Sequence, residues 1–118
     1  MPDRIDLRKS NYGPLYHYPA AATIATRTMP ATAEKKNVLT SVKYSYSAAP
    51  TGGKITIAYT KGGASISEEL DDYIGGPRRV PLDEEIVGDV NTAIVVSLAS
   101  GAGTVVGKVI VSGYQIPG

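Results

Sequence analysis

Few side chains in this sequence could do chemistry, and their spacing does not favour catalysis. His17 is the one histidine, and it lies in a segment rich in Tyr and Pro with no neighbouring acid to orient its ring. A general base needs such a partner within hydrogen-bond reach. Cysteine is absent, which excludes thiolate nucleophiles, thiolate metal sites and disulfides. We therefore expect no catalytic residue, and we interpret His17 as a surface or interface ring.

Acidic side chains come in adjacent sets, at residues 68–69, 71–72 and 83–85. Glycosidases use two carboxylates, and calcium is bound by carboxylate oxygens. Adjacent acids in a strand, however, point to opposite faces, and the run DDYIGG (71–76) lacks the alternating ligands of a calcium loop. The Gly pairs of the chain are not followed by the residues of a phosphate-binding loop. We expect a solvated acidic surface with no metal and no cofactor; a cation held by residues 68–89 is the alternative.

Charge is unevenly distributed, although the net charge is only +1. Residues 1–36 carry six Lys or Arg against three acids, a net charge of +3, whereas residues 68–89 carry eight acids against two Arg, a net charge of −6. This separation favours head-to-tail contact between neighbours or docking on a charged lattice, and the alternative is two solvated surfaces without a partner. No dense basic cluster is present, so we expect no nucleic-acid partner. No apolar run is long enough to cross a membrane, and we expect no membrane contact.

Residues 1–20 are predicted to form an extended N-terminal arm, followed by one β-sandwich domain over residues 21–118. The arm contains three Pro, a density that excludes a helix and a central strand. Its Tyr residues alternate along YGPLYHY (12–18) and offer apolar rings with polar tips. We expect the arm to lie over the domain or over a neighbouring subunit. The arm residues that we expect to bind a partner are Tyr12, Tyr16, His17 and Tyr18.

Apolar and polar residues alternate through the first half of the domain. Strands are predicted at residues 21–28, 38–47 and 54–60. Gly pairs at 52–53 and 62–63 are ten residues apart, a spacing typical of a run of antiparallel strands. The residues predicted to face the core are Val38, Val42, Tyr44, Tyr46, Ile55, Ile57 and Tyr59.

Residues 64–74 (ASISEELDDYI) carry competing signals. A capping box and an apolar stripe at helical spacing favour a short helix. The hairpin rhythm on both sides favours an exposed edge strand whose charges discourage aggregation, and we predict the strand. Residues 77–91 are predicted to be a long connection. Within it, Arg78 and Arg79 are either an ion-pair hook for an acidic partner or a solvated loop tip.

The last quarter of the chain has two runs of aliphatic residues around a Ser-Gly-Ala-Gly turn at 100–103, which predicts a closing hairpin. Both faces of the runs are apolar, so the hairpin should lie inside a sandwich or at a subunit contact. Gly107 and Gly113 interrupt the second run, which indicates a bulge or a bend. The residues predicted to share one face are Ile94, Val96, Leu98, Val105, Val109 and Val111.

These elements predict an all-β fold, an antiparallel β-sandwich of about seven or eight strands with a jelly-roll-like arrangement. The segments SVKYSYSAAPTGGKITIAYTKGG (41–63) and GDVNTAIVVSLASGAGTVVGKVIVSGYQ (88–115) resemble small structural proteins of tailed bacteriophages. The resemblance covers residues 38–115 and leaves the arm unmatched. The matching positions are Gly52, Gly53, Ile55, Ile57, Asn91, Leu98, Gly101, Val105, Gly107, Val109, Val111, Gly113 and Tyr114.

The resemblance implies a virion component such as a capsid decoration (cement) protein or a head or tail accessory subunit. We therefore expect a non-enzymatic structural protein that is made in the host cytoplasm, is located in the virion, and binds and stabilises the capsid lattice. Its expected partners are the major capsid protein or other virion subunits, with self-association to a dimer or trimer. The alternative is a glycan- or receptor-binding module of a phage fibre or tail, against which the absence of Trp counts.

Overall fold

The computed structural model describes residues 10–11, 15–82 and 84–118 of the chain, and the regular elements there are all β-strands. No helix that could cross a membrane is found among these residues. The strands, in chain order, are β1 (Ser10–Asn11), β2 (Leu15–His17), β3 (Ala25–Met29), β4 (Lys35–Tyr46), β5 (Gly53–Lys61), β6 (Ala64–Asp72), β7 (Gly76–Arg79), β8 (Ile86–Val87), β9 (Ile94–Leu98) and β10 (Gly107–Pro117).

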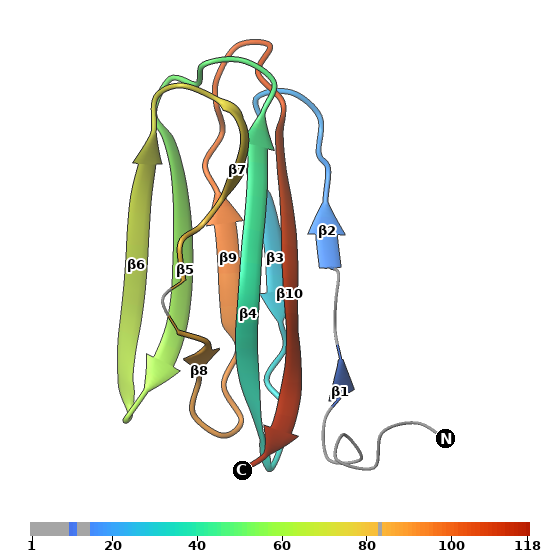
Figure 1. Ribbon diagram of the computed structural model, residues 1–118, viewed down its shortest axis with the longest axis vertical. Coiled ribbons are helices and arrows are strands. Elements are labelled where there is room, and N and C mark those ends of the chain that lie inside the picture. The colour runs from blue at the N-terminus through green and yellow to red at the C-terminus, as the bar shows by residue number, and fades with distance from the viewer. Residues whose placement is uncertain (1–9, 12–14, 83) are drawn as a thin grey trace.

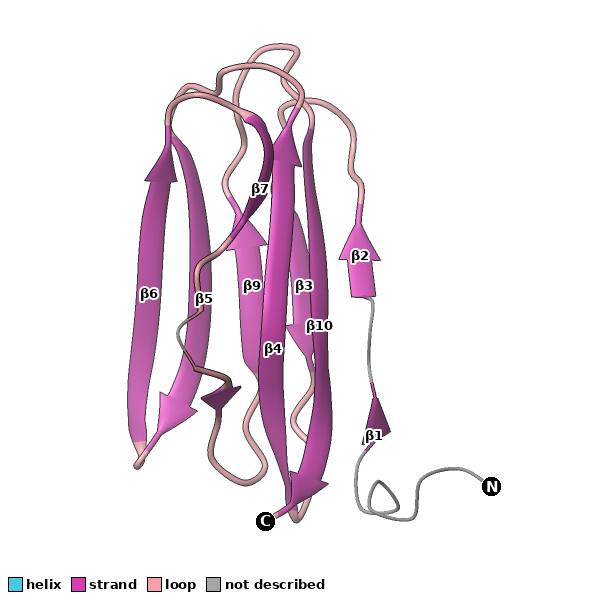
Figure 2. Ribbon diagram, in the orientation of Figure 1, coloured by secondary structure: helices cyan, strands magenta, loops and turns pink. Residues whose placement is uncertain are grey.

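The strands form two antiparallel sheets that face each other (Figure 1). The six-stranded sheet has the order β2-β10-β4-β7, with β1 also paired to β10 and β8 also paired to β4. The four-stranded sheet has the order β3-β9-β5-β6. Most connections pass from one sheet to the other, whereas the hairpin β5–β6 stays within the four-stranded sheet and the connections β1–β2 and β7–β8 join strands of the six-stranded sheet (Figure 2). This winding is that of a jelly roll, so the predicted jelly-roll-like β-sandwich is confirmed.

The hydrophobic core lies between the sheets and is built from residues that alternate along the long strands. The burial pattern of β9, for example, switches at every residue, as expected for a strand with one face inward. Tyr59 and Val105, also predicted to face inward, are partly buried against this core. The predicted core residues that are buried in it are Val42, Tyr44, Tyr46, Ile55, Ile57, Ile94, Val96, Leu98, Val109 and Val111. Val38 is also buried, but it lies outside this core cluster.

A β-bulge changes which residues of β4 reach the core. The register of β4 against β10 slips between Ser112 and Gly113, so that Thr40 is the extra residue. Leu39 consequently joins the core, although strict alternation along the strand would place it on the other face. Gly113 is required at this point because a Cβ there would overlap the carbonyl oxygen of Val38. The predicted bulge or bend at Gly113 is thus right in its place, but the extra residue belongs to β4 and not to the last strand.

The predicted closing hairpin is wrong in its pairing. The two runs do form strands, β9 and β10, but β9 pairs with β3 and β5, whereas β10 pairs with β2 and β4. Residues 99–106 therefore cross from one sheet to the other. Each strand lies inside its own sheet with a neighbour on both sides, and one face of each is buried in the core.

Residues 64–74 contain the predicted edge strand, β6, which has one neighbour, β5. The predicted connection at 77–91 is held to the outer side of β4 by β7 and β8. Val80 and Ile86 of this connection are buried, and the Val80 N–H donates to the Val42 carbonyl over 2.9 Å.

The described part of residues 1–20 lies along the edge of the six-stranded sheet. In β2, Leu15, Tyr16 and His17 pair with residues 109–111 of β10, and Leu15 packs against the core. Pro-rich sequence on either side of β2 is compatible with this position because an edge strand has hydrogen-bond partners on one side only. Residues 1–9 and 12–14, which include Tyr12, lie outside the described residues.

Candidate partner-binding site

The outward face of the six-stranded sheet carries a row of side chains that crosses four strands. Tyr16 lies opposite Ile110, Ile110 opposite Lys43, and Lys43 opposite Arg79. These residues point outward because they alternate with core residues on each long strand, and directly paired residues share a face of the sheet. A second row runs beside it, with Lys108 opposite Ser45 and Ser45 opposite Pro77.

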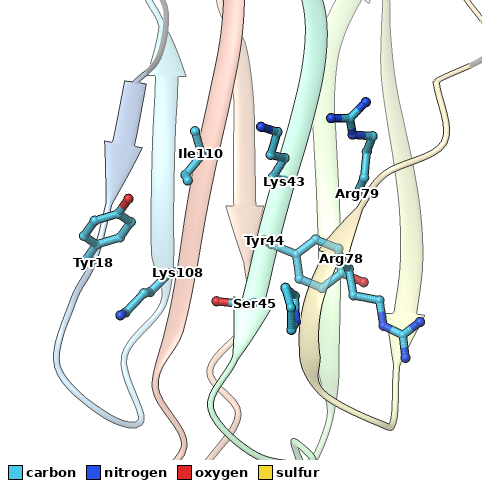
Figure 3. A pocket seen from close by; sticks show the side chains of 9 residues that line it. Tyr18, Lys43, Tyr44, Ser45, Arg78, Arg79, Lys108 and Ile110 are labelled. Atoms are coloured by element: carbon cyan, nitrogen blue, oxygen red, sulfur yellow. The ribbon is translucent and has the colours of Figure 1, made fainter.

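The two rows border a shallow groove with a volume of about 410 Å³, which we call the basic groove. In Figure 3, Tyr18 and Lys108 lie on one side of it and Arg78 and Arg79 on the other, on segments that are far apart in the sequence. The residues that line it are Tyr18, Lys43, Tyr44, Ser45, Pro77, Arg78, Arg79, Lys108 and Ile110.

Positive charge in the basic groove is largely uncompensated. Arg78 has an acid nearby, since its Nε lies 3.9 Å from Oδ2 of Asp72. Within the described part of the chain, Lys43, Arg79 and Lys108 form no ion pair. Four cationic side chains around one groove create a positive potential that attracts an acidic surface.

An exposed aromatic pair lies at one end of the basic groove. The rings of Tyr16 and Tyr18 stack with their centroids 4.8 Å apart and are 59% and 50% exposed. The Nζ atom of Lys108 lies 5.3 Å from the centroid of the Tyr18 ring, within the range of a cation–π contact. Exposed Tyr rings next to cations are typical of surfaces that become buried in a complex.

His17 points away from this groove, toward the four-stranded sheet. It alternates with Tyr16 and Tyr18 along the chain, and its Nδ1 accepts a hydrogen bond of 3.0 Å from the backbone N–H of Thr26. This bond ties β2 to β3 at the open side of the sandwich. Its Nδ1 is thus used inside the protein, and contact of His17 with a partner stays a prediction.

Asp72 fixes the turn from which Arg78 and Arg79 follow. Its Oδ1 accepts hydrogen bonds from the backbone N–H groups of Ile74 (2.9 Å) and Gly75 (3.1 Å). Burial alone would raise the pKa of the Asp72 carboxyl, but these two bonds and the charge of Arg78 hold it below its ordinary value. Burial, followed by the nearby charge of Asp72, raises the pKa of the Tyr44 hydroxyl. The predicted solvated acidic surface is therefore wrong for Asp72, which is only 4% exposed.

A second groove, with a volume of about 380 Å³, lies between the β5–β6 hairpin and the connection at 81–87; we call it the acidic groove. The Tyr59 hydroxyl donates to Oε2 of Glu68 over 2.8 Å, and the Tyr114 hydroxyl donates to Glu85. The residues that line the acidic groove are Tyr59, Lys61, Glu68, Pro81, Leu82, Glu84, Glu85, Ile86 and Val87. Among residues 10–11, 15–82 and 84–118, no three His, Cys, Asp or Glu side chains are placed to hold a metal ion.

Sequence reasoning singled out Tyr16, Tyr18, Arg78 and Arg79. The structure brings Tyr18 and both Arg residues to the border of one groove, with Tyr16 stacked on Tyr18. Arg79 pairs with the outward Lys43, whereas Arg78 pairs with the buried Tyr44 and belongs to the other face of β7.

Sequence reasoning did not single out Lys43 and Lys108, because each looks like an ordinary polar residue on the outward side of a strand. The available signal was their alternation with buried Val42 and Val109, which places both side chains outward.

No family model and no curated protein matches the chain. Among solved structures, the chain is similar to a chain in the cryo-EM structure of the extra small virus VLP of the giant freshwater prawn Macrobrachium rosenbergii. The two chains are 13% identical, the match covers 97% of this chain and 83% of that chain, and the TM-score is 0.32.

Proposed function

We propose that this chain is a non-enzymatic structural protein of a bacteriophage particle that binds and stabilises the capsid lattice as a decoration (cement) subunit. The observation that carries the proposal is the basic groove. It combines three cations that lack an acid partner among the described residues with exposed Tyr rings, all on the face of one sheet. Its partners would be the major capsid protein or other virion subunits.

Two further features support this function. Residues 38–115 resemble small structural proteins of tailed phages in their strand and glycine pattern. The jelly roll is used by viral capsid proteins, but also by lectin domains and cupins, so the fold supports the proposal by analogy alone.

The proposed mechanism is attachment of a stiff body across a seam between subunits. The basic groove lies over paired strands, so its backbone is already ordered before binding and no loop has to be fixed; the cost of ordering falls on the long Lys and Arg side chains. Tyr16 and Tyr18 would contribute buried apolar area, while Lys43, Arg79 and Lys108 would select an acidic partner.

Coexpression with the major capsid protein of the same genome tests this function. We expect the chain to sediment with assembled particles and to raise the temperature at which they release their contents. Lys43→Gln/Arg79→Gln should reduce the amount bound, whereas Lys54→Gln/Glu69→Gln, which removes an exposed ion pair outside the basic groove, should not. Absence of the wild-type chain from the particles would contradict the proposal.

Glycan binding by a fibre or tail module is the second candidate, and the Tyr16–Tyr18 pair beside Lys108 favours it. Tyr rings can stack on sugars, and Lys108 could accept an acidic sugar. Titration with defined acidic and neutral oligosaccharides distinguishes the two functions. Saturable binding that Tyr18→Ala abolishes would favour the glycan, and no binding would favour the virion subunit.

A further inference from the structure

The basic groove and the acidic groove carry opposite charge and lie at different places on one body. The basic groove crosses the outward face of β10, β4 and β7, whereas the acidic groove lies at the β5–β6 hairpin and the connection at 81–87. We propose that the basic groove of one copy binds the acidic groove of a second copy, head to tail. This inference rests on the proposed function in so far as the basic groove is the contact surface, and it names the partner.

Each groove keeps charge that its own chain does not neutralise. Among the described residues, Glu68, Glu84 and Glu85 form no ion pair, and Lys61 is the one cation that lines the acidic groove. Tyr hydroxyls donate to Glu68 and Glu85, and such neutral donors leave the negative charge in place. The basic groove has the opposite imbalance, so each groove supplies what the other lacks.

The two grooves also resemble each other in having apolar residues among their charged ones. Ile110 and Pro77 lie among the cations of one, and Leu82 and Pro81 lie among the acids of the other. Apolar residues with charged neighbours are the usual composition of a contact that excludes water at its centre and keeps a polar rim.

A contact between two different surfaces is heterologous, so a bound pair of copies retains one free basic groove, on one copy, and one free acidic groove, on the other. Such contacts close into a ring when the rotation between copies permits, and otherwise continue as a chain. On a particle, this contact would link neighbouring decoration subunits to each other.

Sedimentation velocity of the purified chain at micromolar concentration tests the contact without any capsid protein. We expect wild-type protein to associate, and its association to weaken as salt is added, because exposed charges are screened. Lys43→Gln/Arg79→Gln removes charge from the basic groove and Glu84→Gln/Glu85→Gln from the acidic groove. Each variant alone should associate at least about tenfold more weakly.

An equimolar mixture of the two variants gives the decisive result. One native basic groove and one native acidic groove are then present, on different chains, so a 1:1 dimer should form and nothing larger. Lys54→Gln/Glu69→Gln is the matched control and should associate like wild type. All four changes in the grooves are at exposed positions, and thermal melts should show folded variants.

Association that survives both sets of changes would overturn the inference, and so would a wild-type chain that stays monomeric at low salt. A monomeric chain that still binds particles through Lys43 and Arg79 would mean that another virion subunit occupies the basic groove. In that case the proposed function stands and the self-contact fails. Self-association without particle binding would mean that the self-contact stands and the proposed function fails.

Discussion

Asn37 is a buried amide that joins segments distant in the sequence. Its Nδ2 atom donates to the carbonyl oxygens of Met29 (3.2 Å), Pro30 (2.9 Å) and Thr92 (2.9 Å). Its Oδ1 atom accepts a hydrogen bond of 3.2 Å from Gln115. The side chain is 1% exposed, so the groups that it satisfies have no easy access to water. Asn37 therefore connects the end of β3 and the segment before β9, which belong to the four-stranded sheet, with β10 of the six-stranded sheet.

We predict that Asn37→Ala lowers the free energy of unfolding by about 2–4 kcal/mol, because it leaves buried carbonyl groups without a donor. Urea denaturation followed by circular dichroism measures this loss. Thr23→Ala serves as the control, since the Thr23 hydroxyl makes an exposed bond to Ala21 and its removal should change little. Equal stability of the two variants would show that Asn37 is not a structural residue.

Asp72 should make stability depend on acid pH. Its pKa is lowered in the folded state, so its contribution is present at neutral pH and is lost as the pH falls through the folded-state pKa, below about 4. Asp72→Ala also removes the acceptor for the Ile74 and Gly75 N–H groups, and we expect a loss of about 2 kcal/mol at pH 7.

Chemical denaturation across pH checks this prediction. The difference between wild type and Asp72→Ala should shrink as the pH falls below about 4. Glu69→Ala, at an exposed ion pair, should cost no more than about 0.5 kcal/mol at any pH. A constant difference for Asp72→Ala over the whole pH range would show that its charge plays no part.

At the scale of elements, β9 shows which structural properties its sequence predicts and which it does not. Its period-two pattern correctly predicted that Ile94, Val96 and Leu98 are buried. The same pattern gave the wrong neighbour, because alternation encodes which face is buried and says nothing of which strand lies alongside. A Gly-containing loop serves a hairpin and a sheet-to-sheet crossing equally well.

The same limit applies to the candidate site. Tyr16, Tyr18, Arg78 and Arg79 stood out by residue type and spacing, but their proximity depends on the register of β2 against β10 and of β7 against β4. Long-range pairing of this kind has no local signal. Asp72 was misread because an acid that caps a turn and an acid in water have similar sequence surroundings.

We expect Leu98→Ala to cost about 2–5 kcal/mol, since Leu98 is completely buried and its truncation leaves a cavity between the sheets. Thermal or urea unfolding measures the loss. Val95→Ala, at a half-buried position on the outward face of the same strand, is a matched control and should cost much less. A silent Leu98→Ala would contradict the assignment of the core.

Removal of residues 1–20 should lower the melting temperature, because β2 pairs with β10 and Leu15 packs against the core. It would also leave one edge of β10 unpaired and prone to aggregation. Deletion of residues 1–9 keeps both β1 and β2 and is the control. If deletion of 1–20 leaves melting unchanged, the segment behaves as the independent arm that its Pro content suggests.

At the scale of the whole molecule, a basic groove and an acidic groove lie on one sandwich. The alternative to self-contact is that the acids of the acidic groove bind a cation. We predict that a chelator leaves the melting temperature unchanged, since no three acidic or His side chains among the described residues are placed to hold a metal. A rise in melting temperature with calcium that Glu84→Gln/Glu85→Gln removes would assign the acidic groove to a cation instead.

The position of β10 between β2 and β4 has a consequence for how the molecule is made. Strands β2 and β4 are synthesised early, and both pair with β10, the last strand. The six-stranded sheet therefore cannot form completely until residues 107–117 have been synthesised. Strand pairs this far apart in sequence form slowly, on a timescale of about milliseconds to seconds for sandwiches. Until then β4 has an open edge, and the nascent chain has to stay out of contact with its neighbours while the final strand is added.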